Sequence, residues 1–526
     1  MERILRKLLP TLLLAALTLF LAVGLLLPAA RLGAELFAGS ALGSLLTAYN
    51  IRAFTNTLTM GLAVGLAATA TGFAVALHIV TTRGTTSTLA RALFPAALFA
   101  PSVMPAIGLI YLIGNNGLLI QTPLYGAVGI FLGALIFTLP HTTLQVLLTL
   151  QKFDYRLMQA ARSLGASDSR CFFTVILPHC RLGLINAFLI AFVLTVTDFG
   201  VPKLLGGNYP MLATEIYNQA IGNQDYAAAA FLSLWLLLPS VLAFYFSTHC
   251  RPKGQNSQGA GFPAQSLSQN IVSALLAWAF LLFELASIIV VIYGSFVTFW
   301  PYVPELTLAN YQFRNSTYGI EPWFNSFILA FWVAVCGTVF AFAGAYIKLR
   351  IDFVPGTLKK LYEALATVPL CIPGTVLGLA FALAFSGVSL FACAAGAMAL
   401  LVFNTLVHLY TVSHMSAVNT LASVDRRLET VGLSLGVSRL QTIRRVLIPM
   451  SVNGIGEVFC YLFASALTTI SAVVFLYTPQ TMPAAVAAIQ MIDSGFISEG
   501  AAMSTLIFVS ALAVRCIALK LFSHRK

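Results

Sequence analysis

Twelve apolar segments, each long enough to cross a membrane, set the limits on what this chain of 526 residues can fold into. About 20 consecutive apolar residues cross the hydrocarbon layer as a helix. Only 9% of the residues are charged, whereas a soluble protein carries about 25%. We therefore predict an all-α polytopic membrane protein with about twelve transmembrane helices. The segments lie near residues 9–30, 56–80, 93–113, 125–148, 182–200, 227–246, 270–297, 325–347, 361–386, 390–412, 453–477 and 500–518.

The basic residues indicate how these helices are oriented. With the N-terminus inside, 25 of the 29 Lys and Arg residues fall in inside segments. Inside loops of membrane proteins are enriched in Lys and Arg, so we predict cytoplasmic N- and C-termini, with the first apolar segment retained as a helix. The net charge of +12 is therefore interpreted as an orientation signal, and because the charges are scattered over short loops with no separate basic domain, nucleic-acid binding is not expected. Membrane lipid is the expected surrounding.

A polar stretch divides the chain into two halves. Residues 250–268 are rich in Gly, Ser and Gln and are predicted to form a flexible cytosolic linker. Residues 1–249 and 269–526 then hold six predicted spans each. Because an even number of spans returns the chain to the same side, the two halves are predicted to be parallel repeats.

Matching landmarks support the duplication. Two prolines four positions apart interrupt both the third and the ninth predicted spans. Prolines within a span are tolerated where neighbouring helices satisfy the freed carbonyls, so both spans are expected to break there and to face the bundle interior. An asparagine also stands at the start of the second and the eighth spans. These residues are Pro101, Pro105, Pro369, Pro373, Asn56 and Asn325.

One inside loop occurs twice, at an offset of 271 residues and with no insertion or deletion. The first copy, Asp154 to Pro178, reads DYRLMQAARSLGASDSRCFFTVILP. The second copy, Asp425 to Pro449, reads DRRLETVGLSLGVSRLQTIRRVLIP. A doubled loop between apolar spans suggests that each half presents one docking site to a partner.

The loop pattern predicts a rigid helix–turn–helix. About ten residues of helical pattern end at Gly165 or Gly436, where glycine can turn the chain without strain. Ser167 and Ser438 follow as N-caps of a second short helix, and Gln441 completes a capping box with Ser438. A rigid element of this kind can transmit a partner's motion to the spans.

The repeated loop resembles the signature cytosolic loop of binding-protein-dependent ABC importer permeases. That pattern is Glu-Ala-Ala, three residues, Gly, nine residues, Ile, one residue and Leu-Pro. The first copy matches with Gln for Glu and Val for Ile, at Gln159, Ala160, Ala161, Gly165, Val175, Leu177 and Pro178. The second copy matches at Gly436, Val446 and Pro449, but has Thr430, Val431 and Gly432 in the Glu-Ala-Ala places and Glu429 one position early.

The resemblance implies a type I importer fold in a bacterial inner membrane. It also implies a separate ATPase subunit, a homodimer with its grooves beneath the two loops on the cytosolic face, and a periplasmic substrate-binding protein above. The chain has no GxxxxGK[ST] phosphate loop, so ATP and Mg are expected on the partner. We expect a transport subunit with no catalytic residue, metal site or cofactor of its own.

Two segments bear on the substrate. Thr197–Tyr226 and Ser471–Met491 look most like the 2-aminoethylphosphonate branch of fused twelve-span permeases. The related ferric-iron and thiamine branches are the alternatives, because the first segment also resembles the iron permeases.

Small polar side chains at equivalent places in the two halves are candidates for a substrate path. Hydroxyl groups there suit a zwitterionic phosphonate, although Ser and Thr also pack membrane helices. Asp198 fits a helix-end or gate residue better than a substrate ligand. The candidates are Thr197, Asp198, Thr468, Thr469 and Ser471.

Two other classes of protein remain as alternatives. An ion-coupled secondary transporter with twelve spans would carry buried coupling acids, for which Glu284 is a candidate, although we favour a structural pairing for it. A membrane enzyme would need clustered His, Asp or Glu, and the sequence offers none at one membrane level. His141 and His408 are expected to be interior histidines with satisfied hydrogen bonds. The doubled loop favours the importer.

Overall fold

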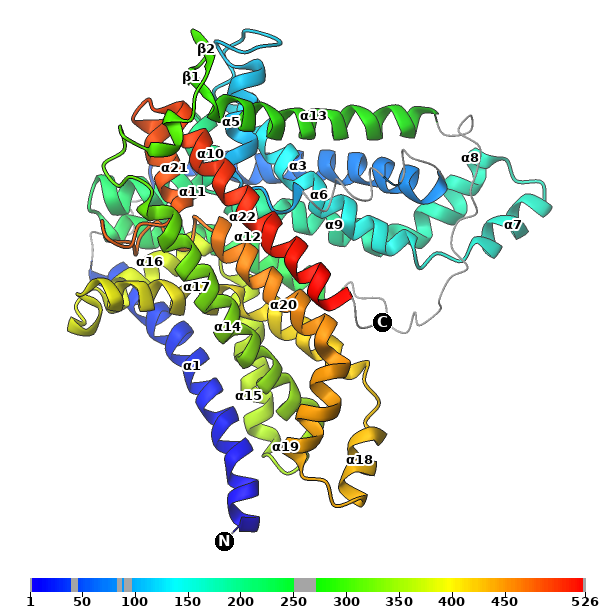
Figure 1. Cartoon of the computed structure of the whole chain (residues 1–526). Helices are drawn as coiled ribbons and strands as arrows, with labels where there is room; N and C mark the ends of the chain where they lie inside the picture. Colours follow the sequence, from blue (N-terminus) through cyan, green and yellow to red (C-terminus); the bar gives the residue numbers. More distant parts are fainter. Residues whose placement is uncertain (1, 39–45, 83–87, 89–96, 250–270, 524–526) are drawn as a thin grey trace.

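The computed structural model describes residues 2–38, 46–82, 88, 97–249 and 271–523. The described part is almost entirely helical, with one two-stranded hairpin. Figure 1 shows two arms of helices that meet at one end and diverge toward the α7–α8 and α18–α19 loops at the other. The elements therefore form two bundles that share one end of the molecule.

The first half runs from α1 to α12. Its elements are α1 (Glu2–Ala38), α3 (Ala48–Thr81), α5 (Val103–Ile113), α6 (Ala127–Leu150), α7 (Tyr155–Ser163), α8 (Asp168–Cys171), η1 (Phe172–Ile176), α9 (Leu177–Thr197), α10 (Gly200–Leu205), α11 (Leu212–Tyr217), η2 (Asn218–Gly222) and α12 (Tyr226–His249).

The second half runs from α13 to α22 and adds the hairpin, in which Val297 pairs with Leu306 and Phe299 with Val303. Its elements are α13 (Ile271–Ser295), β1 (Val297–Phe299), β2 (Val303–Leu306), η4 (Ala309–Gln312), α14 (Glu321–Arg350), α15 (Gly356–Thr367), η5 (Val368–Cys371), α16 (Gly374–Phe385), η6 (Ser389–Phe391), α17 (Ala394–Ala422), α18 (Arg427–Ser434), α19 (Arg439–Thr442), η7 (Ile443–Leu447), α20 (Ile448–Thr468), α21 (Ala484–Asp493) and α22 (Ile497–Ser523).

The prediction of a polytopic all-α membrane protein is confirmed, with fewer full-length spans than the expected twelve. In the described residues, ten helices are long and apolar enough to cross a membrane, or eleven if α15 and α16 form one broken span. The predicted third span, 93–113, contributes only the eleven-residue helix α5. Residues 89–96, which precede α5, lie outside the described part of the chain.

The predicted ninth span is bent at its prolines. α15 with η5 and α16 meet at 113° across a short break. Pro369 lies in η5, and Pro373 is the residue before α16. Proline cannot donate a backbone hydrogen bond and disfavours helical conformation in the residue before it, so the paired prolines end one helix and begin the next.

Equivalent helices pack in the same way in the two halves. α3, α6 and α9 contact one another, as do α14, α17 and α20. A Cβ on Gly183 would lie 2.2 Å from Thr149 Oγ1, and a Cβ on Gly454 would lie 2.3 Å from Thr420 Oγ1. Both glycines therefore allow the span after the loop to cross closely over the span before it.

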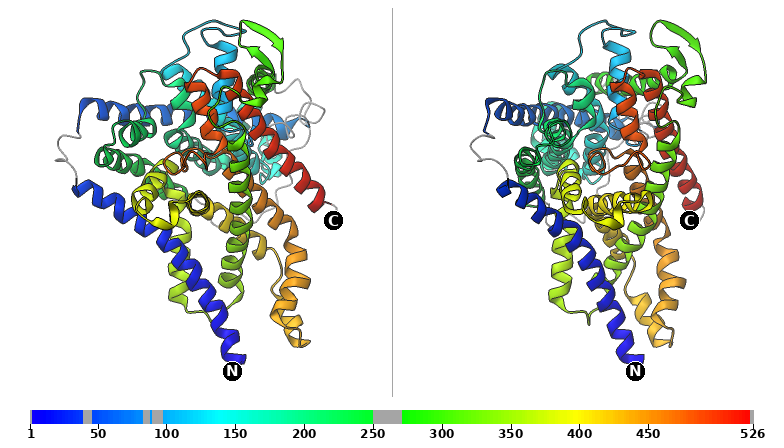
Figure 2. Two further views of the ribbon diagram at one scale, coloured as in Figure 1. Left: turned by 60° about the vertical axis from the view of Figure 1, so that its left-hand side comes forward. Right: turned by 90° about the vertical axis from the view of Figure 1, so that its left-hand side faces the viewer.

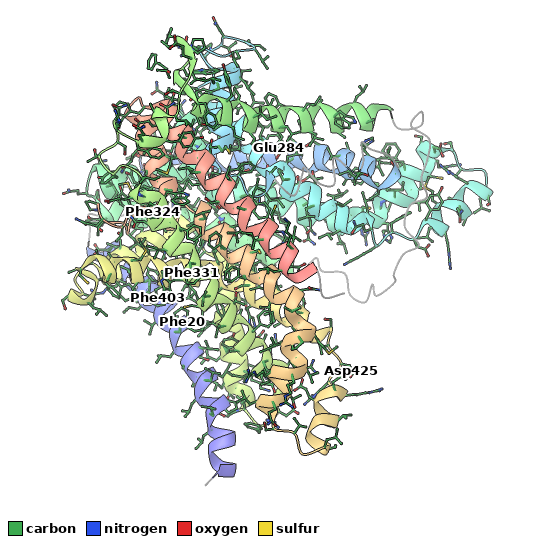
Figure 3. The ribbon with its side chains drawn as sticks, viewed as in Figure 1. Phe20, Glu284, Phe324, Phe331, Phe403 and Asp425 are labelled. Atoms are coloured by element: carbon green, nitrogen blue, oxygen red, sulfur yellow. The ribbon has the colours of Figure 1, made fainter. Side chains whose placement is uncertain are left out.

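The first helix of each half packs against the other half. α1 contacts α14, α15, α16 and α17, and the Phe20 ring lies 4.9 Å from the Phe403 ring, centroid to centroid (Figures 2 and 3). α13 contacts α3 and α5, where a Cβ on Gly108 would lie 2.4 Å from the carbonyl oxygen of Ser287. The two halves are therefore interlocked by an exchange of their first helices.

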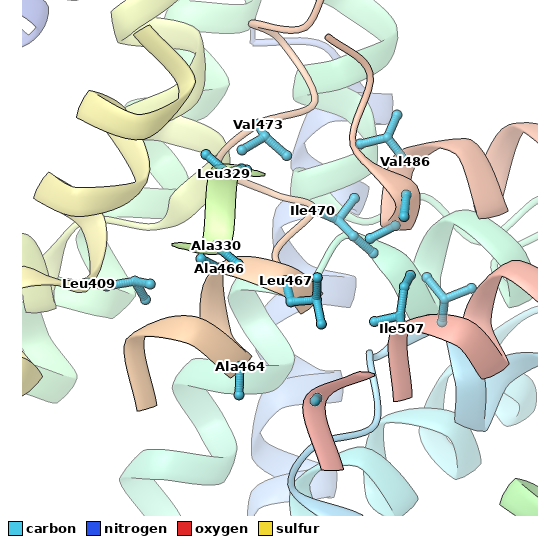
Figure 4. Packing of buried hydrophobic residues seen from close by; sticks show 14 of the residues in the cluster. Leu329, Ala330, Leu409, Ala464, Ala466, Leu467, Ile470, Val473, Val486 and Ile507 are labelled. Carbon is cyan, nitrogen blue, oxygen red and sulfur yellow. The ribbon is translucent and has the colours of Figure 1, made fainter. Parts of the chain in front are cut away.

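The largest buried apolar cluster draws on both halves. Leu329 and Ala330 of α14, Ala466 of α20 and Ile507 of α22 surround the chain that follows α20 (Figure 4). Helices α1, α5 and α13 add further residues to the same cluster. This core lies where the two arms meet, so it fixes the geometry of the segments after α9 and α20.

Exchange of the first helices makes assembly from two fragments a direct test of the two-repeat organisation. The predicted linker at 250–268 lies outside the described residues, and the boundaries 1–249 and 269–526 stay predictions. Co-expressed fragments 1–255 and 256–526 should co-purify as a tight complex, because α1 and α13 each bury an apolar face on the other fragment. If both fragments insert into the membrane but do not associate, the predicted organisation as two self-contained repeats is wrong.

Candidate docking loops and central path

The two loops fold as the same helix–turn–helix. Gly165 has φ +83° and Gly436 has φ +74°, the left-handed conformation that glycine adopts without strain. The hydroxyl of Ser167 accepts the backbone N–H of Arg170 at 3.3 Å. Ser438 and Gln441 form the predicted capping box. The predicted turn and caps are confirmed in both loops.

The same aspartate hydrogen bond stands at the start of both loops, although α18 begins one position later than α7 at the offset of 271. The carboxylate of Asp154 accepts the N–H of Arg156 at 3.0 Å, and that of Asp425 accepts the N–H of Arg427 at 2.9 Å. Such N-caps satisfy donors that would otherwise lack a partner at the helix start. The equivalence of the two copies therefore extends to individual hydrogen bonds.

The second helix of each loop is continuous with the next span, and this differs from the separate short helix that the sequence suggested. α8, η1 and α9 form one helix, Asp168–Thr197, and α19, η7 and α20 form another, Arg439–Thr468. A single π turn precedes Pro178 and Pro449. Proline has no N–H and clashes with the carbonyl four residues earlier, and a π turn shifts that carbonyl. Movement of either loop is therefore passed directly to a span.

Exposed leucines mark the outer face of both loops. Leu164 is 88% exposed and its equivalent Leu435 is 76% exposed, each directly before the turn glycine. Leu157 and Leu428, also equivalent, are exposed as well. Apolar side chains paired in this way indicate a partner-binding surface. The residues that match the family pattern surround them: Gln159, Ala160, Gly165, Pro178, Gly436 and Pro449 are exposed, and Ala161 is half-buried.

Glu429 faces the spans instead of the outer surface. Its carboxylate lies 3.2 Å from Nε of Arg350 at the end of α14, and its side chain is 14% exposed. Arg350 also donates to the carbonyls of Leu421 and Val424, at 2.7 and 2.5 Å. Glu429, which stands one position early relative to the family pattern, therefore links the second loop to α14 through an ion pair. No local sequence pattern could have paired residues so far apart.

The candidate path residues lie where α9 and α20 end. The hydroxyl of Thr197 donates to the carbonyl of Val193 at 2.8 Å, and that of Thr468 donates to the carbonyl of Ala464 at 3.0 Å. Both side chains are half-buried, as are Thr469 and Ser471. The hydroxyl hydrogens of Thr197 and Thr468 are used within their helices, so each hydroxyl can take part in a further hydrogen bond only as an acceptor.

Asp198 occupies a helix-end position. Its carboxylate accepts the N–H of Gly200 at 3.3 Å and that of Val201 at 2.8 Å, and so caps the short helix α10. In the second half, the hydroxyl of Ser471 packs against Gly374. A Cβ on Gly374 would lie only 2.4 Å from this hydroxyl oxygen. These contacts position the backbone of the two segments.

The segments after α9 and α20 meet each other across the two halves. The ring of Tyr217 lies between Phe199, at 5.2 Å, and Phe475 of the second half, at 5.9 Å, measured between ring centroids. Lys203 forms an ion pair with Asp493 of the second half at 3.1 Å. Aromatic packing and this ion pair therefore join the two halves where the segments after α9 and α20 meet.

The repeated asparagines hold these segments in place. Asn56 of α3 donates to the carbonyl of Pro210 at 3.1 Å, and Asn325 of α14 donates to that of Gln480 at 3.0 Å. Each asparagine therefore binds the chain that follows the fifth span of its own half. The sequence indicated that the two asparagines are equivalent, but it could not predict which carbonyl groups they bind.

Glu284, His141 and His408, the buried ionisable residues that the sequence singled out, differ in their hydrogen bonding. Glu284 is 4% exposed, and its Oε2 has no hydrogen-bond partner among the described residues, so the expected structural pairing is not seen. Nδ1 of His141 lies 3.2 Å from the carbonyl of Phe137, whereas Nδ1 of His408 has no partner among the described residues. In the same part of the chain no three His, Cys, Asp or Glu side chains gather as a metal site.

The chain is similar to known transport proteins over most of its length. The family model for the binding-protein-dependent transport system inner membrane component matches residues 68–253 and 353–526. The ferric transport system permease protein FbpB of Actinobacillus pleuropneumoniae is 27% identical over 490 residues, covering 89% of this chain and 70% of the relative.

Two further relatives extend the comparison. A putative ferric transport system permease protein, FbpB 1 of Haemophilus influenzae, is 27% identical over 82% of this chain and 71% of its own length. A spermidine/putrescine permease PotC homolog of Mycoplasma genitalium is 30% identical over 28% of this chain and half of its own length. These relatives are transport subunits without enzymatic activity. The chain therefore belongs to the family of binding-protein-dependent ABC importer permeases of the inner membrane.

Proposed function

We propose that the loops Asp154–Pro178 and Asp425–Pro449 are the two contacts of this permease with a homodimeric ATPase, which binds ATP and Mg. The observation that carries the proposal is the equivalence of the two loops, with Leu164 and Leu435 exposed at the same position. A two-fold partner requires two equivalent contacts on the permease. The enrichment of Lys and Arg in these loops supports a cytoplasmic position for both of them.

Two features support transmission of the ATPase motion to the path. Each loop continues through a π turn into α9 or α20 without a break. Those helices end at Thr197 and Thr468, next to the segments that close the path. A periplasmic binding protein would deliver substrate at the closed end, opposite the loops.

We propose 2-aminoethylphosphonate as the substrate, on the likeness of the segments Thr197–Tyr226 and Ser471–Met491 to that branch. The lone pairs of Thr197 and Thr468 suit the ammonium group of this zwitterion. Ferric iron is the second candidate, because two relatives that cover 89% and 82% of this chain are named ferric transport permeases.

Growth of a deletion strain separates the two substrates. Loss of this gene should abolish growth on 2-aminoethylphosphonate as sole phosphorus source and leave growth on chelated ferric iron as sole iron source unchanged. The wild-type gene supplied in trans should restore growth. The converse pattern would transfer the assignment to ferric iron and leave the importer function intact.

A further inference from the structure

A groove of about 760 Å³ opens between the loop-proximal ends of α6 and α9. Leu148 of α6 and Leu182 of α9 form aliphatic walls, and Leu157 of the first loop also lines it. Figure 1 shows α6 and α9 side by side where they approach the α7–α8 loop. The groove therefore lies at the end of the spans that charge placement assigns to the cytoplasm.

The polar lining of the groove is basic. Lys152, two residues after the end of α6, and Arg181, in the first turns of α9, are both exposed and both line it, together with His179. Neither Lys152 nor Arg181 forms an ion pair with any residue that the structure describes. No acidic side chain is among the described residues of the lining. The groove thus presents unneutralised positive charge beside an apolar wall.

A buried acceptor lies at the deeper end. Asn186, one turn beyond Leu182, lines the groove, and its Oδ1 is buried without a hydrogen-bond partner among the described residues. Buried polar atoms are nearly always paired in proteins, so an unpaired one next to an open groove favours a ligand that carries a donor. The groove therefore offers cations at its mouth, aliphatic walls, and a polar contact inside.

The second half lacks this chemistry although it shares the helix crossing. At the offset of 271 residues, Lys152, His179 and Arg181 correspond to Ser423, Met450 and Val452. The crossing itself is retained, with Gly183 over Thr149 matched by Gly454 over Thr420. The basic lining is therefore a property of one half, not a by-product of the repeat.

We propose that this groove binds the headgroup of an anionic phospholipid of the cytoplasmic leaflet. Lys152 and Arg181 contact the phosphodiester, Leu148 and Leu182 contact the start of an acyl chain, and a headgroup or glycerol hydroxyl donates to Asn186. Basic pockets between membrane helices at this level bind anionic headgroups in this way. A free phosphate would make no use of the aliphatic walls. Because Leu157 belongs to the loop, the bound lipid also joins the loop to the spans.

Native mass spectrometry of the purified full-length chain tests the proposal. Phosphatidylglycerol and phosphatidylcholine are titrated separately, and bound lipid is counted. The wild-type chain should retain phosphatidylglycerol in preference to phosphatidylcholine. The double variant Lys152→Gln/Arg181→Gln should bind phosphatidylglycerol roughly 10- to 30-fold more weakly, because each basic residue near the surface contributes about fivefold in affinity.

Two further variants control for charge and folding. Lys360→Gln/Lys520→Gln removes two exposed cations from α15 and α22, away from the groove, and should bind like the wild type. Lys152→Arg/Arg181→Lys keeps the charge and should also retain the lipid. Equal retention by the glutamine variant of the groove, or equal binding of the two lipids, would overturn the proposal. Displacement of phosphatidylglycerol by an equal concentration of inorganic phosphate would show that the groove takes a free anion instead of a lipid.

Discussion

Replacing Leu164 and Leu435 by aspartate should separate this permease from its ATPase. Each leucine lies at the outer tip of a loop, 88% and 76% exposed, so the change costs the folded permease little. In the assembled transporter each leucine would be buried in an ATPase groove, where a carboxylate is strongly disfavoured. Loss of two apolar anchors should weaken association on the order of 100-fold or more. Co-purification of the ATPase with the membrane-extracted permease measures this directly.

A matched pair of leucines separates this effect from a general effect of surface charge. Leu119 and Leu390 are 67% and 70% exposed and precede α6 and α17, at the opposite ends of those spans from the loops. Leu119→Asp/Leu390→Asp should keep the ATPase bound. Of the single loop variants, Leu164→Asp should have the larger effect, because the first loop fits the family pattern more closely. Undiminished recovery of the ATPase with Leu164→Asp/Leu435→Asp would refute the docking role of the loops.

Enlarging two side chains at the end of α20 should stop transport while ATP hydrolysis continues. Thr468 and Thr469 are half-buried beside the segment that we propose closes the path, and Ile470 next to them is packed against Gly200 of the other half. Thr468→Leu/Thr469→Leu adds bulk where the two halves must separate. Overpacking of this kind costs about 1–3 kcal/mol, which corresponds to a fall in uptake of roughly 5- to 150-fold.

Uptake by reconstituted vesicles, with ATPase activity recorded in the same preparation, checks this result. Thr55→Leu/Thr59→Leu is the matched control, because both hydroxyls are exposed on α3 and bond to carbonyls of their own helix. The control should transport at the wild-type rate. Wild-type uptake by Thr468→Leu/Thr469→Leu would remove these residues from the path.

The loops could be predicted from the sequence because their structure is set locally. A glycine at φ +83° or +74° and a serine cap two residues later are determined by a few neighbouring residues, and the second copy provided an internal check. The proline break of the ninth span was predictable for the same reason. The helix ends, the length of α5 and the π turns before Pro178 and Pro449 depend on finer backbone geometry than an apolar pattern carries.

Contacts between residues that lie far apart in the chain could not be predicted from the sequence. Glu429 looked like a misplaced member of the family pattern, but its position is explained by Arg350 at the end of α14. Asn56 and Asn325 stood out as repeated landmarks, yet their bonds to Pro210 and Gln480 appear only once the chain is folded. Such partners are selected by tertiary packing, in which residues far apart in the chain compete for the same position.

The exchange of first helices determines the order in which the helices can find their final neighbours during synthesis. α1 enters the membrane first, but α15 and α16, which it packs against, belong to the other half and are synthesised much later. α13, by contrast, emerges when α3 and α5 are already in place. During synthesis α1 must therefore stay in lipid without α15 and α16, which a leucine-rich helix tolerates because lipid is as apolar as leucine. Fusion into one chain keeps α1 close to those late neighbours and raises its effective concentration for them.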